Sequence, residues 1–98
     1  MSISKERNGN ALMLALEGRL DTITAPELEK EFKSSVDGVS ELTLDLAGLE
    51  YISSAGLRVL LSMQKAMNRL GKMEIKNVNE TVMEIFEVTG FSDILTII

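Results

Sequence analysis

The sequence predicts an α/β domain in which a mixed β-sheet is flanked by helices. Three observations indicate this fold class. An Asn8-Gly9-Asn10 turn separates two strand-like segments near the start. Leucines alternate with other residues over 12–16 and again over 42–46. A long amphipathic pattern begins at Ser54. Segments in which apolar residues recur every second residue, followed by segments in which they recur about every 3.6 residues, are typical of chains that alternate strands and helices. We expect the order ββαβαβα, followed by an apolar tail.

The first two elements read as a β-hairpin. Residues 1–7 are mostly polar and carry three charges, which suits a short edge strand protected from pairing with other chains. The Asn-Gly pair at residues 8–9 is a strong signal for a tight turn. Over residues 11–16 the leucines alternate with the small Ala11 and Ala15, as expected of a strand that is covered on both faces.

The next part of the sequence predicts a loop, a helix and a buried strand. The loop spans residues 18–24, and residues 24–27 read Thr-Ala-Pro-Glu, which matches a capping box with proline in the first turn. Apolar side chains then recur at helical spacing until Asp37-Gly38, where the helix ends. The leucines of residues 41–46 predict a strand, which passes into a short loop over 47–52.

The last part predicts the longest helix, one more strand and a final helix. The helix over residues 54–70 has a polar stripe at helical spacing and is otherwise apolar. A strand follows over 72–76. Asn77 and Glu80 have the cap-and-acid spacing of a helix start, so the final helix begins within residues 77–80, and it ends at Gly90. The apolar residues 91–98 must then dock on the core.

Composition excludes several classes of function. A chain of 98 residues makes one domain, residues 1–98. The net charge is −5, and no basic patch with neighbouring aromatics is present, so we expect no nucleic acid partner. The chain has no cysteine and no histidine, and it therefore lacks a thiolate and the commonest general base and metal ligand. We expect a protein that is not an enzyme, with no catalytic residues, metal or cofactor.

The sequence shows no targeting or membrane-spanning pattern. Its start lacks a basic segment followed by an apolar run. No apolar stretch approaches the roughly 20 residues that a helix needs to cross a bilayer. We expect a cytoplasmic protein without membrane insertion.

Two hydroxyls, Ser53 and Ser54, stand where the longest helix begins. Because the preceding strand leads into this helix, its amino end should lie at the carboxyl edge of the sheet, where α/β proteins place functional groups. Local spacing favours one serine as the N-cap. A phosphate acceptor is the second interpretation, and the two are compatible because a helix amino end favours a dianion. Gly56 in the first turn leaves the backbone open to close approach.

Three carboxylates, Asp21, Asp45 and Glu50, fall at or just after the ends of the neighbouring strands. A catalytic pair or a metal site could be built from such groups. Turn and cap roles are commoner for acids at these positions, and we favour them.

Several motifs resemble those of the STAS domain in its short free-standing form, the bacterial anti-sigma factor antagonist. G-R-L-D at Gly18–Asp21 is similar to the motif after the second strand of that family. The stretch L-D-L-A-G-L-E-Y-I-S-S-A-G-L-R-V-L-L at Leu44–Leu61 resembles its signature. Asn77-Val78 and the V-T-G-F run at Val88–Phe91 resemble its last helix. The central motif is specific, and the resemblance covers nearly the whole chain.

The resemblance implies a phosphorylation switch. In such proteins an anti-sigma factor with serine kinase activity phosphorylates the antagonist, which then releases it, and a metal-dependent serine phosphatase reverses the change. The acceptor is the first hydroxyl of a D-S-[ST]-G pattern, which falls here on Ser54, with Ala55 in the variable place and Gly56 matching the glycine. Ser53 stands where many members have aspartate, which makes it a second candidate acceptor.

The same resemblance implies partner contacts along this region, at Asp21, Thr22, Ser53, Ala55, Gly56 and Arg58. Two other functions stay open. The chain could be a STAS subunit held permanently in a larger assembly, such as a lipid-transport ABC complex. It could also be a receptor that binds a small molecule or nucleotide at the same helix amino end.

Overall fold

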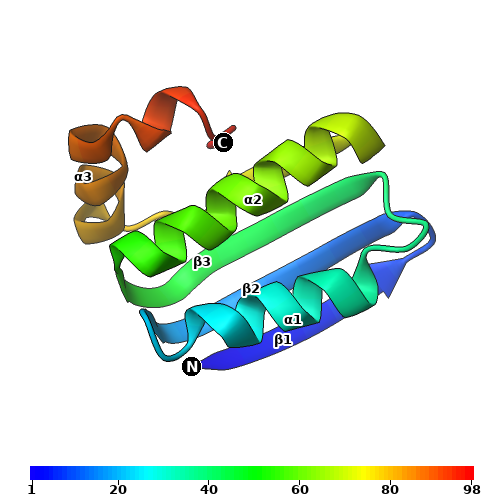
Figure 1. The fold of residues 1–98 in the computed structure, drawn as a ribbon, viewed down its shortest axis with the longest axis horizontal. Coiled ribbons are helices and arrows are strands. Elements are labelled where there is room, and N and C mark those ends of the chain that lie inside the picture. The colour runs from blue at the N-terminus through cyan, green and yellow to red at the C-terminus, as the bar shows by residue number, and fades with distance from the viewer.

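The computed structural model describes residues 1–98 as a four-stranded sheet with three α-helices (Figure 1). The elements follow in the order β1 (Ser2–Asn8), β2 (Ala11–Leu20), α1 (Ala25–Ser35), β3 (Glu41–Ile52), α2 (Ser54–Leu70), β4 (Lys72–Lys76), α3 (Glu80–Thr89) and a 3-10 turn, η1 (Phe91–Asp93). The order ββαβαβα is therefore confirmed. No helix combines the length and the apolar character that crossing a bilayer requires.

The sheet is mixed, with the strand order β1-β2-β3-β4. β1 pairs antiparallel with β2 across the two-residue turn Gly9-Asn10, and β2, β3 and β4 are parallel. The predicted hairpin is confirmed, and the left-handed conformation of Gly9, with φ of 65°, supplies its tight turn. The tail also docks as expected, because Ile97 forms an isolated bridge beside Ile75 at the outer edge of β4.

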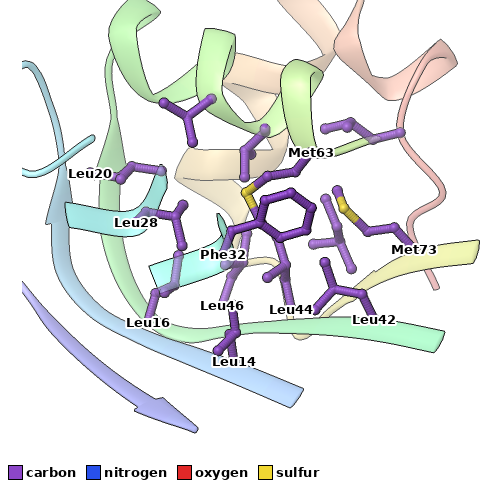
Figure 2. Packing of buried hydrophobic residues seen from close by; sticks show 14 of the residues in the cluster. Leu14, Leu16, Leu20, Leu28, Phe32, Leu42, Leu44, Leu46, Met63 and Met73 are labelled. Carbon is purple, nitrogen blue, oxygen red and sulfur yellow. The ribbon is translucent and has the colours of Figure 1, made fainter. Parts of the chain in front are cut away.

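The helices α1 and α2 lie side by side over the same face of the sheet (Figure 1). Both parallel connections step in the same direction along the sheet, from β2 to β3 and from β3 to β4. Right-handed connections that step in one direction place their helices on one face. The leucines of β2 and β3 point to that face and form the core with Phe32, Met63 and Met73 (Figure 2).

The expectation that the second strand is covered on both faces is wrong. Leu12, Leu14 and Leu16 are buried, whereas Ala11 and Ala15 on the opposite face are only half-buried. The hairpin brings no helix with it, so neither α1 nor α2 reaches that face. The small alanines do not mark a second layer of helices.

Two segments expected to be loops are strands. β2 continues to Leu20 and β3 continues to Ile52, and the two remain paired over this length. Their register shifts twice, between Ala15 and Glu17 and between Gly18 and Arg19. These irregularities break the alternation of apolar residues on which the sequence prediction relied. The strands therefore lead almost directly into α1 and α2.

The amino end of α3 also differs in its capping residue. The side chain of Asn79, and not Asn77, accepts a hydrogen bond from the backbone N–H of Val82 at 2.9 Å. Asn77 has a φ of 59° and instead donates a side-chain hydrogen bond to Asp45. Gly90 ends the helix in the left-handed conformation, as predicted.

Strand β1 is tied to the far end of α1 by Arg7. Its guanidinium donates to the carbonyl oxygens of Ser35 at 3.1 Å and Asp37 at 2.8 Å. These carbonyls lie in the last turn of α1 or just beyond it, where no partner is left within the helix. Lys5 adds an ion pair with Glu31 at 3.1 Å. The edge strand and the helix above it are thus joined by side chains as well as by the core.

Candidate functional site

The two serines at the start of α2 have different environments. Ser53 is the N-cap, with extended backbone dihedrals, and its Oγ accepts a hydrogen bond from the N–H of Gly56 at 3.4 Å. Its own N–H donates to the carbonyl of Leu20 at 2.9 Å, and the residue is half-buried. Ser53 therefore fastens the helix start to the end of β2, which is the capping role that the spacing favoured.

Ser54 is the first residue of α2, and its side chain is exposed. Its hydroxyl forms no hydrogen bond within the protein. It lies at the positive end of the helix dipole, beside backbone N–H groups that have no partner in the helix. No acidic residue occupies the first turn of α2. The site is open to reagents and electrostatically suited to a dianion.

Gly56 has a role that the sequence interpretation did not give it. The residue is buried, and a Cβ there would lie 2.8 Å from the side chains of both Ile52 and Leu20. It would also lie 2.9 Å from the carbonyl oxygen of Leu20. The ends of β2 and β3 thus approach the backbone closely at this position. The glycine lets α2 start close to the sheet, and in this way it presents its neighbour Ser54 at the surface.

Asp21 organises the start of α1. Its Oδ1 accepts hydrogen bonds from the N–H groups of Ile23 at 3.0 Å and Thr24 at 3.1 Å. The hydrogen bond from the Thr24 backbone lowers the pKa of Asp21 below its ordinary value of 3.8, against a smaller opposing effect of desolvation. Asp21 therefore has the turn role that we favoured over catalysis.

The predicted capping box at Thr24 and Glu27 is wrong. Thr24 has helical dihedrals, and its side chain makes no capping hydrogen bond. Its hydroxyl instead donates to the carbonyl of Arg19 at 2.8 Å and accepts from the N–H of Asp21 at 2.8 Å. Because Asp21 already orders this turn, the threonine side chain is directed back to β2 rather than forward along the helix.

The other two carboxylates do not join Asp21. Asp45 lies within β3, and its Oδ1 accepts hydrogen bonds from the Asn77 side chain and the Ala47 N–H, both at 3.0 Å. The hydrogen bond from Asn77 makes the largest contribution to lowering the pKa of Asp45. Glu50 is exposed on the same strand. No group of three acids is assembled that could hold a metal ion.

A groove runs between the two helices and begins beside Ser54. It is bounded by residues 22–34 of the preceding loop and α1 and by residues 55–69 of α2, and we call it the α1–α2 groove. Thr22, Ala55 and Arg58 line the part nearest to Ser54, which has a volume of about 820 Å³. Arg58 is exposed and forms no ion pair. The structure thus brings together three of the residues expected to contact a partner.

The sequence interpretation missed an apolar and aromatic surface near the same edge of the sheet. Ile23, in the turn held by Asp21, is 83% exposed. The guanidinium of Arg19 lies over the ring of Tyr51, with 4.5 Å from its carbon to the ring centroid. The contact between Arg19 and Tyr51 has no signal in the sequence, because the two residues meet through the irregular pairing of β2 and β3.

A family model described as the STAS domain matches residues 2–98. A protein of Bordetella bronchiseptica with the name "Putative anti-sigma factor antagonist BtrV" is 34% identical over 99 residues, which cover 99% of this chain and 85% of that protein. An anti-sigma-B factor antagonist of Staphylococcus epidermidis is 32% identical over 80 residues, which cover 80% of this chain and 74% of that protein.

Solved structures of the same fold include SpoIIAA of Bacillus in two states. Its phosphorylated form has a TM-score of 0.77 with this chain at 15% identity, and the match covers 99% of this chain and 91% of that one. Its unphosphorylated form, named an anti-sigma factor antagonist, has a TM-score of 0.78 at the same identity, with 99% and 87% covered. At this identity the likeness shows a common fold.

Proposed function

The chain belongs to the STAS domain family, as its motifs predicted, and we propose on that basis that it is an anti-sigma factor antagonist. In this proposal it binds an anti-sigma factor while Ser54 is unmodified and releases it when Ser54 carries phosphate. The observation that carries the proposal is the exposed, unbonded hydroxyl of Ser54 at the first position of α2. Relatives named anti-sigma factor antagonists support the class of partner.

The anti-sigma factor acts as the serine kinase in this proposal. The Ser54 Oγ attacks the γ-phosphorus of ATP, its proton passes to a base of the kinase, and ADP leaves as the β–γ bridging bond breaks. This chain supplies the acceptor and the docking surface and is not itself an enzyme. A metal-dependent serine phosphatase would hydrolyse the phosphoserine and restore binding. Such a cycle needs ATP and a sigma factor, which places the protein in the cytoplasm.

Phosphate changes the docking surface without a need to refold the domain. It adds about −1.5 to −2 charges at neutral pH. The unpartnered N–H groups at the start of α2 favour that charge within the fold. A partner surface that fitted a small neutral hydroxyl beside Ala55 would meet a desolvated dianion. A loss of only about 1.4 kcal/mol in binding free energy weakens an affinity tenfold.

Ser54 is preferred to Ser53 because of their environments. Ser53 Oγ is already an acceptor in the N-cap, and the residue is half-buried. Phosphorylation there would alter the cap, whereas Ser54 can be modified with its neighbours in place. Ser53 remains the second candidate acceptor.

Phosphorylation assays with the anti-sigma factors of the source organism test the proposal. Each factor is incubated with the protein and ATP, and the product is analysed by intact mass and fragment mapping. We expect one phosphoryl group on Ser54, its absence in Ser54→Ala, and its retention in Ser53→Ala. Binding by Ser54→Asp should be at least about tenfold weaker than by Ser54→Ala.

Two outcomes would contradict the proposal. If no anti-sigma factor binds the unmodified protein, the class of partner is wrong. If one binds but phosphate never reaches either serine, the permanently assembled subunit becomes the better interpretation.

A further inference from the structure

The α1–α2 groove extends well beyond the serines. Its first part, of about 820 Å³, adjoins a second hollow of about 550 Å³, and Glu29, Lys33, Arg58 and Val59 line both. From Ala55 to Arg69 it follows α2 over a sequence separation of fourteen residues. That length corresponds to roughly 21 Å at the rise of an α-helix, about 1.5 Å per residue. The groove is therefore elongated along the helices and is not a compact pocket.

Charge is segregated into this groove. Five of the ten Lys and Arg residues line it, against one of the fifteen Asp and Glu residues. The five cations are Lys30, Lys33, Arg58, Lys65 and Arg69. The chain as a whole has a net charge of −5. A basic stripe on an acidic domain is a local feature that composition does not reveal.

Most of these cations have no partner within the protein. Lys33 pairs with Glu29 at 2.9 Å, and the other four form no ion pair. Lys33 and Arg69 lie in the last turns of their helices, where a cation offsets the helix dipole. That explanation does not extend to Lys30 and Lys65, which lie before the last turns, or to Arg58, which lies near the start of α2.

The floor between the cations is apolar. Phe32, Val59 and Met63 form part of it, and all three are buried. Figure 2 shows Phe32 and Met63 adjacent where α1 and α2 meet over the sheet. Ala55 and Ala66 add small side chains along α2. An occupant that matches this surface has an apolar stripe flanked by carboxylates.

We propose that the α1–α2 groove seats an acidic amphipathic helix of the anti-sigma factor. The inference rests on the proposed function and names the element of the partner that is recognised. A helix of about fourteen residues has the length of the groove. Its apolar face would pack on the floor, and Asp or Glu residues at its borders would meet Lys30 on one side and Arg58 and Lys65 on the other. Cations spread along the whole groove suit such a helix better than a nucleotide, whose phosphates are clustered.

The groove also provides a means of release. Arg58 follows Ser54 by four residues, so their side chains share one face of α2. A phosphate on Ser54 would attract Arg58 and place a dianion at the entrance of the groove. The acidic helix would then lose one cation and meet a like charge. Phosphorylation and docking thus compete for the same guanidinium.

Charge reversal at the far end of the groove tests the proposal. Lys65→Glu with Arg69→Glu changes positions that lie roughly 16 and 22 Å along α2 from Ser54. Lys72→Glu with Lys76→Glu, on β4, makes the same change of net charge outside the groove. In the unphosphorylated state, we expect the groove variant to bind the anti-sigma factor at least about tenfold more weakly than wild type does. We expect the affinity of the β4 variant to be within about twofold of wild type. Thermal melts verify that both variants are folded.

Three results of this titration are distinguishable. If the wild type binds no anti-sigma factor, the proposed function fails, and the groove proposal fails with it. If the wild type binds and the groove variant binds equally well, only the groove proposal is overturned. If both variants lose affinity equally, the effect is one of net charge, and the groove is again excluded.

Carbodiimide cross-linking identifies what occupies the groove. This reagent joins an amine directly to a carboxylate that it touches, without a spacer. In the complex we expect Lys30, Lys33 or Lys65 to couple to partner carboxylates three or four residues apart on one helix. Coupling confined to Lys72 and Lys76 would overturn the proposal. The proposal would also be overturned if the isolated wild-type protein bound ATP saturably and the groove variant did not, since the groove would then be a nucleotide site.

Discussion

The amino ends of α1 and α2 lie at the same edge of the sheet and are built in opposite ways. At α1 the carboxylate of Asp21 accepts two backbone hydrogen bonds, and Glu27 adds an acid in the first turn. At α2 the cap is a single neutral contact of 3.4 Å from Ser53, with no acid in the first turn. The positive end of α1 is therefore neutralised by its own chain, and that of α2 is left unneutralised. The proposed phosphorylation site therefore lies at the helix that lacks an anion of its own.

Gly56→Val should lower the free energy of unfolding the most, because it forces the amino end of α2 away from the ends of β2 and β3. The new side chain would collide with Leu20 and Ile52. Overpacking of this kind costs about 1–3 kcal/mol, and a clash with backbone belongs at the upper end. Urea unfolding gives the free energy of unfolding. Gly56→Ala adds only the Cβ and should therefore lose less stability than Gly56→Val. A Gly56→Val variant as stable as wild type would show that α2 can start further from the sheet.

Asp21→Ala should be next, since it removes the anion that closes the start of α1. The N–H groups of Ile23 and Thr24 lose their acceptor, and we expect Tm to fall by several degrees. Asp21→Asn keeps one acceptor oxygen and should have a smaller effect. Equal melting temperatures for the alanine variant and wild type would mean that the two helix starts are less different than their geometry indicates.

The same contrast predicts how stability depends on pH. The pKa values of Asp21 and Asp45 are lowered below 3.8 in the folded state. Their ionised forms stabilise the fold above that pH, and the contribution is lost as the pH falls through the lowered folded values. Asp21→Asn should therefore lose less stability than wild type between about pH 5 and pH 3. Parallel curves for the two proteins would contradict the role of the ionised carboxylate.

The smallest effect should come from Ser54→Asp, which supplies α2 with the anion it lacks. We expect the free energy of unfolding to rise by about 0.3–1 kcal/mol at low salt. The same substitution should weaken partner binding, so stability and affinity change in opposite directions. Ser54→Asn is the neutral control, and added salt should reduce the gain. A destabilised Ser54→Asp variant would show that this helix end does not favour an anion.

Much of the architecture follows from the sequence, because turn residues and apolar periods marked the hairpin, the bounds of α2 and those of β4. The final residues of β2 and β3 could not be predicted as strand, since the register shifts beside Gly18 interrupt the alternation of apolar and polar residues on which a strand prediction depends. The capping box failed for a related reason. Asp21, three residues upstream of Thr24, already orders the turn. The capping-box motif takes in only residues 24–27, so it does not include this alternative to a Thr24 cap.

The candidate site was predictable in position but not in detail. The spacing of Ser53 and Ser54 showed that one would cap α2, and only the backbone dihedrals at Ser53 assign the cap. The role of Gly56 depends on Leu20, which is distant in the sequence. The basic stripe of the α1–α2 groove needs Lys30 on one helix to face Arg58 and Lys65 on the other. Its charge pattern therefore depends on how the helices are rotated about their axes.

The contacts of Arg7 bear on how the domain opens transiently. An outer strand with one neighbour is ordinarily the first part of a sheet to detach. Here detachment of β1 would also strip the carbonyls of Ser35 and Asp37 of their donors. Amide hydrogens of β1 should consequently exchange with deuterium together with those at the end of α1, as one cooperative unit. The Arg7 contacts lie at the end of the molecule remote from Ser54, so binding of a partner beside Ser54 need not detach β1 from the sheet.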